Sequence, residues 1–98
     1  MDSNDIKNLI NKDISALQKQ NKETAHLFVE PLLCEFEDFC GNELNLWIIL
    51  KKDEYMITFN QKNNRYGLAF TNIFNTQVFM GEYKSLSDTY DNLINQKE

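Results

Sequence analysis

Carboxylates are the residues of this chain that are best placed to do chemistry. Glu35, Glu37, Asp38 and Glu43 lie close together in the sequence. If this segment is helical, Glu35 and Asp38 share one surface because they are three residues apart. Acid–base catalysis would require one of them to lie in an apolar pocket with a shifted pKa. We expect them instead to be solvated, either as an ordinary hydrophilic helix face or as an anionic binding patch.

Histidine and cysteine add little further chemistry. His26 is the single histidine, whereas a metal site usually draws on several His or Cys ligands. On a helix, Cys34 and Cys40 would point in directions too different to share a zinc ion. We therefore expect all three to be packing residues. The sequence predicts no metal and no cofactor.

Motifs of the common enzyme classes are not found in this sequence. Gly41, Gly67 and Gly81 are the only glycines, and they form no phosphate-binding loop. No serine lies in the context of a nucleophile elbow. We therefore predict a protein that is not an enzyme and that acts by binding a macromolecular partner.

The charge balance narrows the class of partner. The formal net charge is −5 and the sequence pI is about 4.8. Nucleic-acid binders depend on Lys and Arg that neutralise phosphates, and anionic membrane surfaces also attract basic segments. The sequence therefore disfavours direct binding to nucleic acid or to a membrane, and it favours encounter with a basic protein.

No segment is predicted to cross or leave through a membrane. The longest uninterrupted apolar run, residues 46–50, is far shorter than the roughly 20 residues that span a bilayer. Residues 1–5 are polar and acidic, unlike the start of a secretory signal. We expect a cytoplasmic protein.

The first part of the chain, residues 1–42, is predicted to be helical. Ser3 is expected to cap a helix that runs to about Gln20. Apolar residues recur there at spacings of three and four: Ile6, Leu9, Ile10, Ile14 and Leu17. Residues 23–29 are ambiguous, and we favour a helix. Pro31 and Gly41 are typical of the start and the end of a second helix.

From Leu44 the apolar period changes to two, which predicts strands joined by short turns. Trp47 is expected in the core, and the small residues Gly67 and Ala69 would leave room for its ring or for a helix. Ser85 is expected to cap a last helix. The predicted fold is α+β and forms a single domain over residues 1–98. It has N-terminal helices, a four-stranded antiparallel β-meander over residues 44–83, and a C-terminal helix over residues 85–96 packed on one face of the sheet.

Five stretches of the sequence resemble a known family. They are a Trp-bearing strand at 46–49, a Tyr-led strand at 54–59, a "YGLA" strand at 66–70, a "GEYKSL" entry to the last helix at 81–86, and residues 36–39. Together they resemble the small immunity proteins of bacterial contact-dependent growth inhibition and related polymorphic toxin systems. The resemblance covers roughly the C-terminal half of the chain.

This resemblance implies a cognate protein toxin as the partner. Such toxins are often nucleases with basic active sites, and immunity proteins often block them with acidic surfaces. Contact residues vary from one toxin to the next, so the family assigns no residue here.

We therefore choose the candidate contact residues by their charge and by their aromatic character. For the charged contacts we predict Glu35, Glu37, Asp38, Glu43, Asp53 and Glu54. For the aromatic contacts we predict exposed rings at Tyr55, Tyr66 and Phe74.

Two other functions are compatible with the sequence. One is a small hydrolase that uses the Glu35 and Asp38 carboxylates with a divalent metal. The other is a non-toxin adaptor or a homodimer whose contact is the outer face of the sheet. The oligomeric state is left open.

Overall fold

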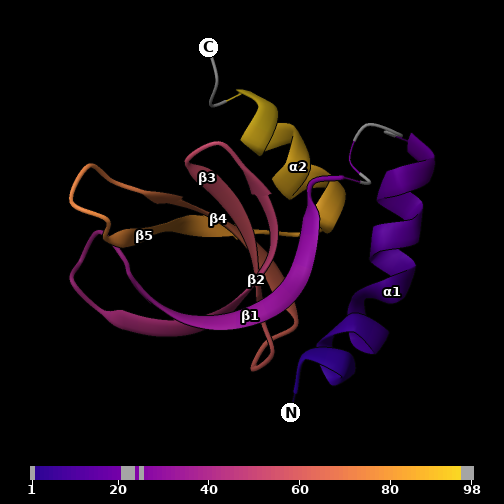
Figure 1. Ribbon diagram of the computed structural model, residues 1–98, viewed down its shortest axis with the longest axis horizontal. Coiled ribbons are helices and arrows are strands. Elements are labelled where there is room, and N and C mark those ends of the chain that lie inside the picture. Colours follow the sequence, from indigo (N-terminus) through magenta and orange to yellow (C-terminus); the bar gives the residue numbers. More distant parts are fainter. Residues whose placement is uncertain (1, 21–23, 25, 96–98) are drawn as a thin grey trace.

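The protein combines two helices with one strongly curved sheet of five strands (Figure 1). The structure is a computed structural model that describes residues 2–20, 24 and 26–95. The elements are α1 (Ser3–Gln20), β1 (Phe28–Glu37), β2 (Glu43–Lys52), β3 (Tyr55–Asn60), β4 (Arg65–Thr71), β5 (Gln77–Tyr83) and α2 (Leu86–Asn95). The α+β class, the first helix, the later strands and the C-terminal helix are confirmed.

The predicted second helix is wrong, because Phe28–Glu37 forms strand β1. Apolar residues of this segment also follow the period of a strand, and Cys34 and Phe36 face the same core cluster at a spacing of two. The segment forms a strand and not a helix because its backbone pairs with that of β2, a contact that is possible only for a strand. Pro31 lies at an irregularity in this pairing, a place where a missing N–H is tolerated.

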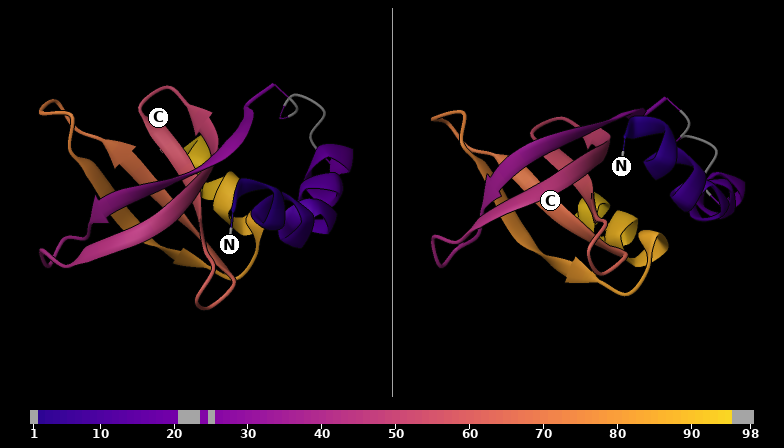
Figure 2. Two further views of the ribbon diagram at one scale, coloured as in Figure 1. Left: turned by 60° about the horizontal axis from the view of Figure 1, so that its bottom comes forward. Right: turned by 90° about the horizontal axis from the view of Figure 1, so that it is seen from below.

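The predicted count of four strands is wrong, because β1 adds a fifth. The five strands form an antiparallel meander that closes into a barrel. Among the described residues, β1 and β5 meet at one position, Glu37 opposite Val78, and run parallel there. The β1–β2 and β4–β5 loops lie at the end of the molecule away from the two helices (Figure 2).

The two faces of the sheet carry separate apolar clusters. The outer face packs against both helices, and its cluster includes Trp47, Ile57 and Leu68 with Ile10 of α1 and Leu93 of α2. The inner face, enclosed by the curved sheet, is filled by strand residues alone: Phe36, Leu46, Ile48, Met56 and Ala69. The predicted core position of Trp47 is confirmed, and its indole N–H donates to Gln61 at 2.8 Å.

Gly67 makes room for a side chain of the neighbouring strand. A Cβ at this position would lie 2.3 Å from Cε1 of Phe79 and 2.8 Å from the carbonyl oxygen of Gly81. The space left by Gly67 is therefore occupied by Phe79 on the inner face, and the expectation that Trp47 or a helix fills it is wrong.

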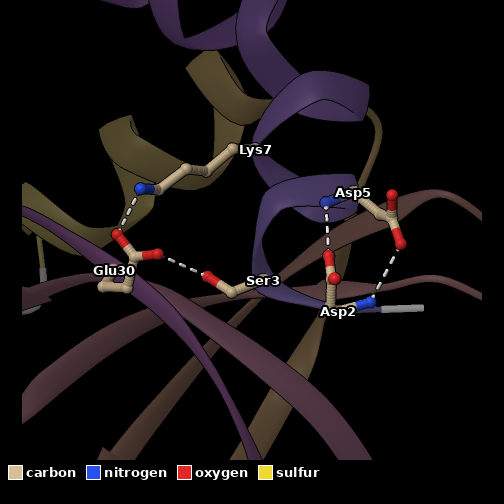
Figure 3. A network of polar contacts seen from close by, with 5 residues as sticks. All are labelled: Asp2, Ser3, Asp5, Lys7 and Glu30. Atoms are coloured by element: carbon tan, nitrogen blue, oxygen red, sulfur yellow. Dashed lines mark hydrogen bonds and ion pairs between the residues drawn. The ribbon is translucent and has the colours of Figure 1, made fainter.

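Polar contacts fix the start of α1 against β1 (Figure 3). The Asp5 amide donates to Asp2 and the Asp2 amide donates to Asp5, each at 3.0 Å, so Asp2 caps the helix in place of the predicted Ser3. The Ser3 hydroxyl donates instead to Glu30 at 2.7 Å, and Lys7 forms an ion pair with the same carboxylate. The hydrogen bond from Lys7 is the main cause that lowers the pKa of Glu30.

Further hydrogen bonds hold α1 against the sheet and cap α2. The Tyr66 hydroxyl donates to Asp13 at 2.6 Å and joins β4 to the middle of α1. The Asp88 amide donates to the Ser85 hydroxyl at 3.1 Å, which confirms Ser85 as the cap of α2. Within the described part of the chain, neither helix is long and apolar enough to cross a membrane.

Candidate functional site

Three carboxylates share one face at the turn end of the β1–β2 hairpin. Glu35 and Glu37 are two residues apart on β1, so their side chains leave the strand on the same side. Glu43 of β2 lies directly opposite Glu37 in the strand pairing. We call Glu35, Glu37 and Glu43 the carboxylate triplet. All three side chains are exposed.

The carboxylate triplet lacks the compensation that Glu30 has on the same strand. Lys7 and Ser3 neutralise and bind Glu30. Across residues 2–20, 24 and 26–95, no lysine or arginine forms an ion pair with Glu35, Glu37 or Glu43. Like charges directly opposite each other across two strands destabilise the pairing. The triplet is therefore a local concentration of negative charge that no ion pair within the described residues neutralises.

Asp38 follows Glu37 directly in the chain, but its carboxylate accepts hydrogen bonds within the β1–β2 loop. It accepts hydrogen bonds from the amides of Cys40 and Asn42, both at 2.9 Å, and from the Asn42 side chain at 3.1 Å. The Asn42 amide bond is the largest of the causes that lower the pKa of Asp38. Asp38 therefore shapes the turn between β1 and β2, and its oxygens are less available to a partner.

The β4–β5 loop borders the same surface. Thr76 and Gln77 line an open hollow of about 180 Å³ together with the carboxylate triplet and Phe36. At the tip of this loop, Ile73 is 90% exposed and Phe74 is 79% exposed. Phe39, at the tip of the β1–β2 loop, is 73% exposed. We call Phe39, Ile73 and Phe74 the apolar loop tips.

The second group of predicted acidic residues lies on the other side of the β4–β5 loop. Glu54 and Tyr55 form a groove with Phe70 and Ile73. Tyr55 is half-buried, and its ring lies 6.2 Å from that of Phe70. Asp53 is exposed in the β2–β3 turn with a φ of 57°. The β4–β5 loop therefore lies between the two acidic groups that the sequence singled out.

Tyr66 does not belong to this surface. Its side chain is only 4% exposed and lies in the core under α1. Burial, and after it the Asp13 carboxylate, raise the pKa of its hydroxyl above the ordinary value. The expectation that this ring is exposed is wrong, because the alternation of β4 turns Tyr66 towards the helices.

Sequence reasoning missed Phe39 and Ile73. Phe39 falls within the predicted helix between Pro31 and Gly41, which the structure replaces by β1 and a turn, and Ile73 lies in the turn between β4 and β5. An isolated large apolar residue inside a short turn between two strands was the signal that could have found both, since such a residue has no core to enter.

The residues considered for metal or acid–base chemistry are not brought together. Glu35 lies on a strand and Asp38 in a turn, so the helical spacing that suggested a joint role is wrong. His26 and Cys40 are exposed, which corrects the expectation that they pack in the core, while Cys34 is partly buried against the inner cluster. Among the described residues, no group of three His, Cys, Asp or Glu could hold a metal ion.

Comparison of this chain with protein-family models, with characterised proteins and with solved structures gave no significant match.

Proposed function

We propose that this chain is an immunity protein that binds and neutralises a basic toxin domain in the cytoplasm. The carboxylate triplet would face Lys and Arg side chains of the toxin, and the apolar loop tips would enter pockets beside them. The partner class comes from the resemblance of residues 36–39 and of the C-terminal half to immunity proteins. Nuclease toxins, which bind phosphates through basic surfaces, fit this charge pattern best.

The observation that carries this proposal is that Glu37 lies opposite Glu43 and that no lysine or arginine of the described residues forms an ion pair with either of them. Such a pair weakens the hairpin that contains it. A cation supplied by a partner removes the repulsion and adds two attractive contacts. The same charges would also steer the approach of a basic protein over distances of about a Debye length, roughly 8–10 Å.

Apolar contacts supply the second part of the proposed interface. Three large side chains exposed by 73% or more at two loop tips cannot contribute to the core of the free protein. Aromatic side chains of this kind are typical of the few residues that carry most of a binding energy. Phe74 and Phe39 would take that role, with Ile73 beside them.

The proposal predicts that a gene beside the one for this chain encodes a toxin, and the test uses the C-terminal domain of that toxin. We expect the purified chain to bind that domain, to block its activity, and to bind more weakly as salt concentration rises. If the two proteins do not form a complex, or if the complex leaves the toxin active, the proposal is rejected.

A pair of charge reversals tests the surface itself. Glu37→Lys should weaken toxin binding by about tenfold or more, since it replaces an attraction by a repulsion at the centre of the triplet. Asp91→Lys, at an exposed position of α2, changes the net charge equally and should have little effect. Equal losses in the two variants would show that net charge, and not this site, governs binding.

A further inference from the structure

The barrel is weakest where its first and last strands meet. Every other neighbouring pair of strands shares at least five opposed residue pairs, whereas β1 and β5 share one among the described residues. This contact is also the one parallel pairing in an otherwise antiparallel sheet. Before Glu37, the described part of β1 therefore has a strand on one side only and an unpaired backbone edge on the other.

The middle of this edge is not covered by a helix. Residues 28–31 of β1 line a groove with Lys7, Ile10 and Ile14, so α1 covers the first part of the strand. Beyond that point Leu32 is 57% exposed and Leu33 is 49% exposed. Proteins usually protect a free strand edge with lysine, proline or a covering segment. Here Pro31 stands at the start of the free stretch, and two leucines follow it.

The charges along β1 favour a partner strand with basic side chains. Its charged residues are Glu30, Glu35 and Glu37, with no lysine or arginine. Lys7 already compensates Glu30, which leaves Glu35 and Glu37 beside the free edge. A second copy of β1 would bring the same carboxylates against each other, whereas a strand with basic side chains would pair with them.

We propose that β1 is a docking edge for an extended, basic segment of the partner protein, which adds a strand between β1 and β5. Because β1 and β5 run parallel, a strand that is antiparallel to both would complete an all-antiparallel barrel. Its backbone would bond along residues 32–35. Its apolar side chains would cover Leu32 on one face of the sheet, and its cations would meet Glu35 and Glu37 on the other face. This mode of binding rests on the proposed function for the identity of the partner.

Hydrogen exchange of the full chain, with a synthetic peptide as the probe, tests this edge. The peptide alternates valine and lysine, and its matched control carries N-methyl groups on the backbone amides of one edge. We expect the first peptide to slow exchange at those amides of residues 32–35 that point away from β2. The N-methylated control should bind about tenfold more weakly or worse, since it keeps the side chains but loses the ladder.

Two further measurements separate the alternatives. Leu32→Gln should weaken peptide binding by about tenfold, whereas Leu9→Gln, at a comparably exposed leucine of α1, should not. Sedimentation of the chain alone should show a monomer, and a dimer that protects residues 32–35 would assign the edge to a second copy and overturn the proposal. Equal binding of the two peptides, or no protection at residues 32–35, would also overturn it. These outcomes leave toxin neutralisation untouched, so failure of the edge and failure of the proposed function are distinguishable.

Discussion

Glu37 and Glu43 face each other across the β1–β2 hairpin and are not compensated by a cation in the described chain. If their repulsion is real, removing one charge should stabilise the free protein. We expect Glu37→Gln to raise the free energy of unfolding by a few tenths of a kcal/mol to about 1 kcal/mol. The gain should shrink at high salt, which screens exposed charges. Urea unfolding at low and high ionic strength measures both effects.

A matched substitution separates local repulsion from net charge. Asp91→Asn removes one negative charge from an exposed position on α2, so it lowers the overall self-repulsion equally. If Glu37→Gln stabilises no more than Asp91→Asn does, the local repulsion is not significant. Residues of a binding site often lower the stability of the free protein and raise the stability of the complex, and Glu37 would follow this pattern.

Among the elements, β1 shows where sequence reasoning reached its limit. The period-two strands from Leu44 onwards and the helices at both ends could be predicted because local pattern and tertiary role agree there, although the cap of α1 is Asp2 and not Ser3. Residues 28–37 carry both periods, and only pairing with β2 and closure against β5 decides between them. The sequence identified the three acidic residues of the carboxylate triplet. It could not predict that they share one face, because this arrangement depends on β1 being a strand.

Tyr66 and Asp13 connect the sheet to α1, and their hydrogen bond makes a prediction about alkaline pH. The native pKa of Tyr66 is raised above its ordinary value, first by burial and then by Asp13. The contribution of the neutral hydroxyl is complete below the unfolded pKa of about 10 and is lost as pH rises above it. Stability should therefore fall above about pH 10, because the unfolded chain loses the proton first.

Replacing this tyrosine tests the connection. Tyr66→Phe should lower the free energy of unfolding by about 1–2 kcal/mol at neutral pH, since it removes a hydrogen bond from the buried hydroxyl to a charged carboxylate. It should also reduce the fall in stability at alkaline pH. Tyr83→Phe, at a half-buried position of β5, controls for the loss of a phenol. Urea unfolding at neutral and alkaline pH gives both quantities, and an identical alkaline slope in wild type and Tyr66→Phe would contradict the assignment.

The contact between β4 and β5 depends on a missing side chain. Gly67→Ala places a methyl group within 2.3 Å of the Phe79 ring and 2.8 Å of the Gly81 carbonyl. We expect a loss of about 1–3 kcal/mol in the free energy of unfolding, the usual result of overpacking. Phe79→Leu should recover part of that loss in the double variant, so a double-mutant cycle should give a clear coupling. Additive effects of the two changes would show that Phe79 does not occupy this space.

At the scale of the whole molecule, the outer apolar cluster joins every part of the fold. It contains Ile6, Ile10 and Leu17 of α1, Leu86, Tyr90 and Leu93 of α2, and residues of the three central strands. Neither helix could keep its apolar side buried without the sheet, and the sheet would expose Trp47 and Leu68 without the helices. The molecule should therefore unfold as one cooperative unit.

Two probes of different parts of the molecule test this cooperativity. Trp47 is the single tryptophan and lies in the shared cluster, so its fluorescence reports on the core. Circular dichroism in the far ultraviolet reports mainly on α1 and α2. We expect both signals to change at the same urea concentration, because loss of either helix uncovers the cluster that surrounds the tryptophan. If the helical signal is lost first while the Trp47 environment persists, the sheet is stable on its own. The helices would then be a cover that a partner could displace.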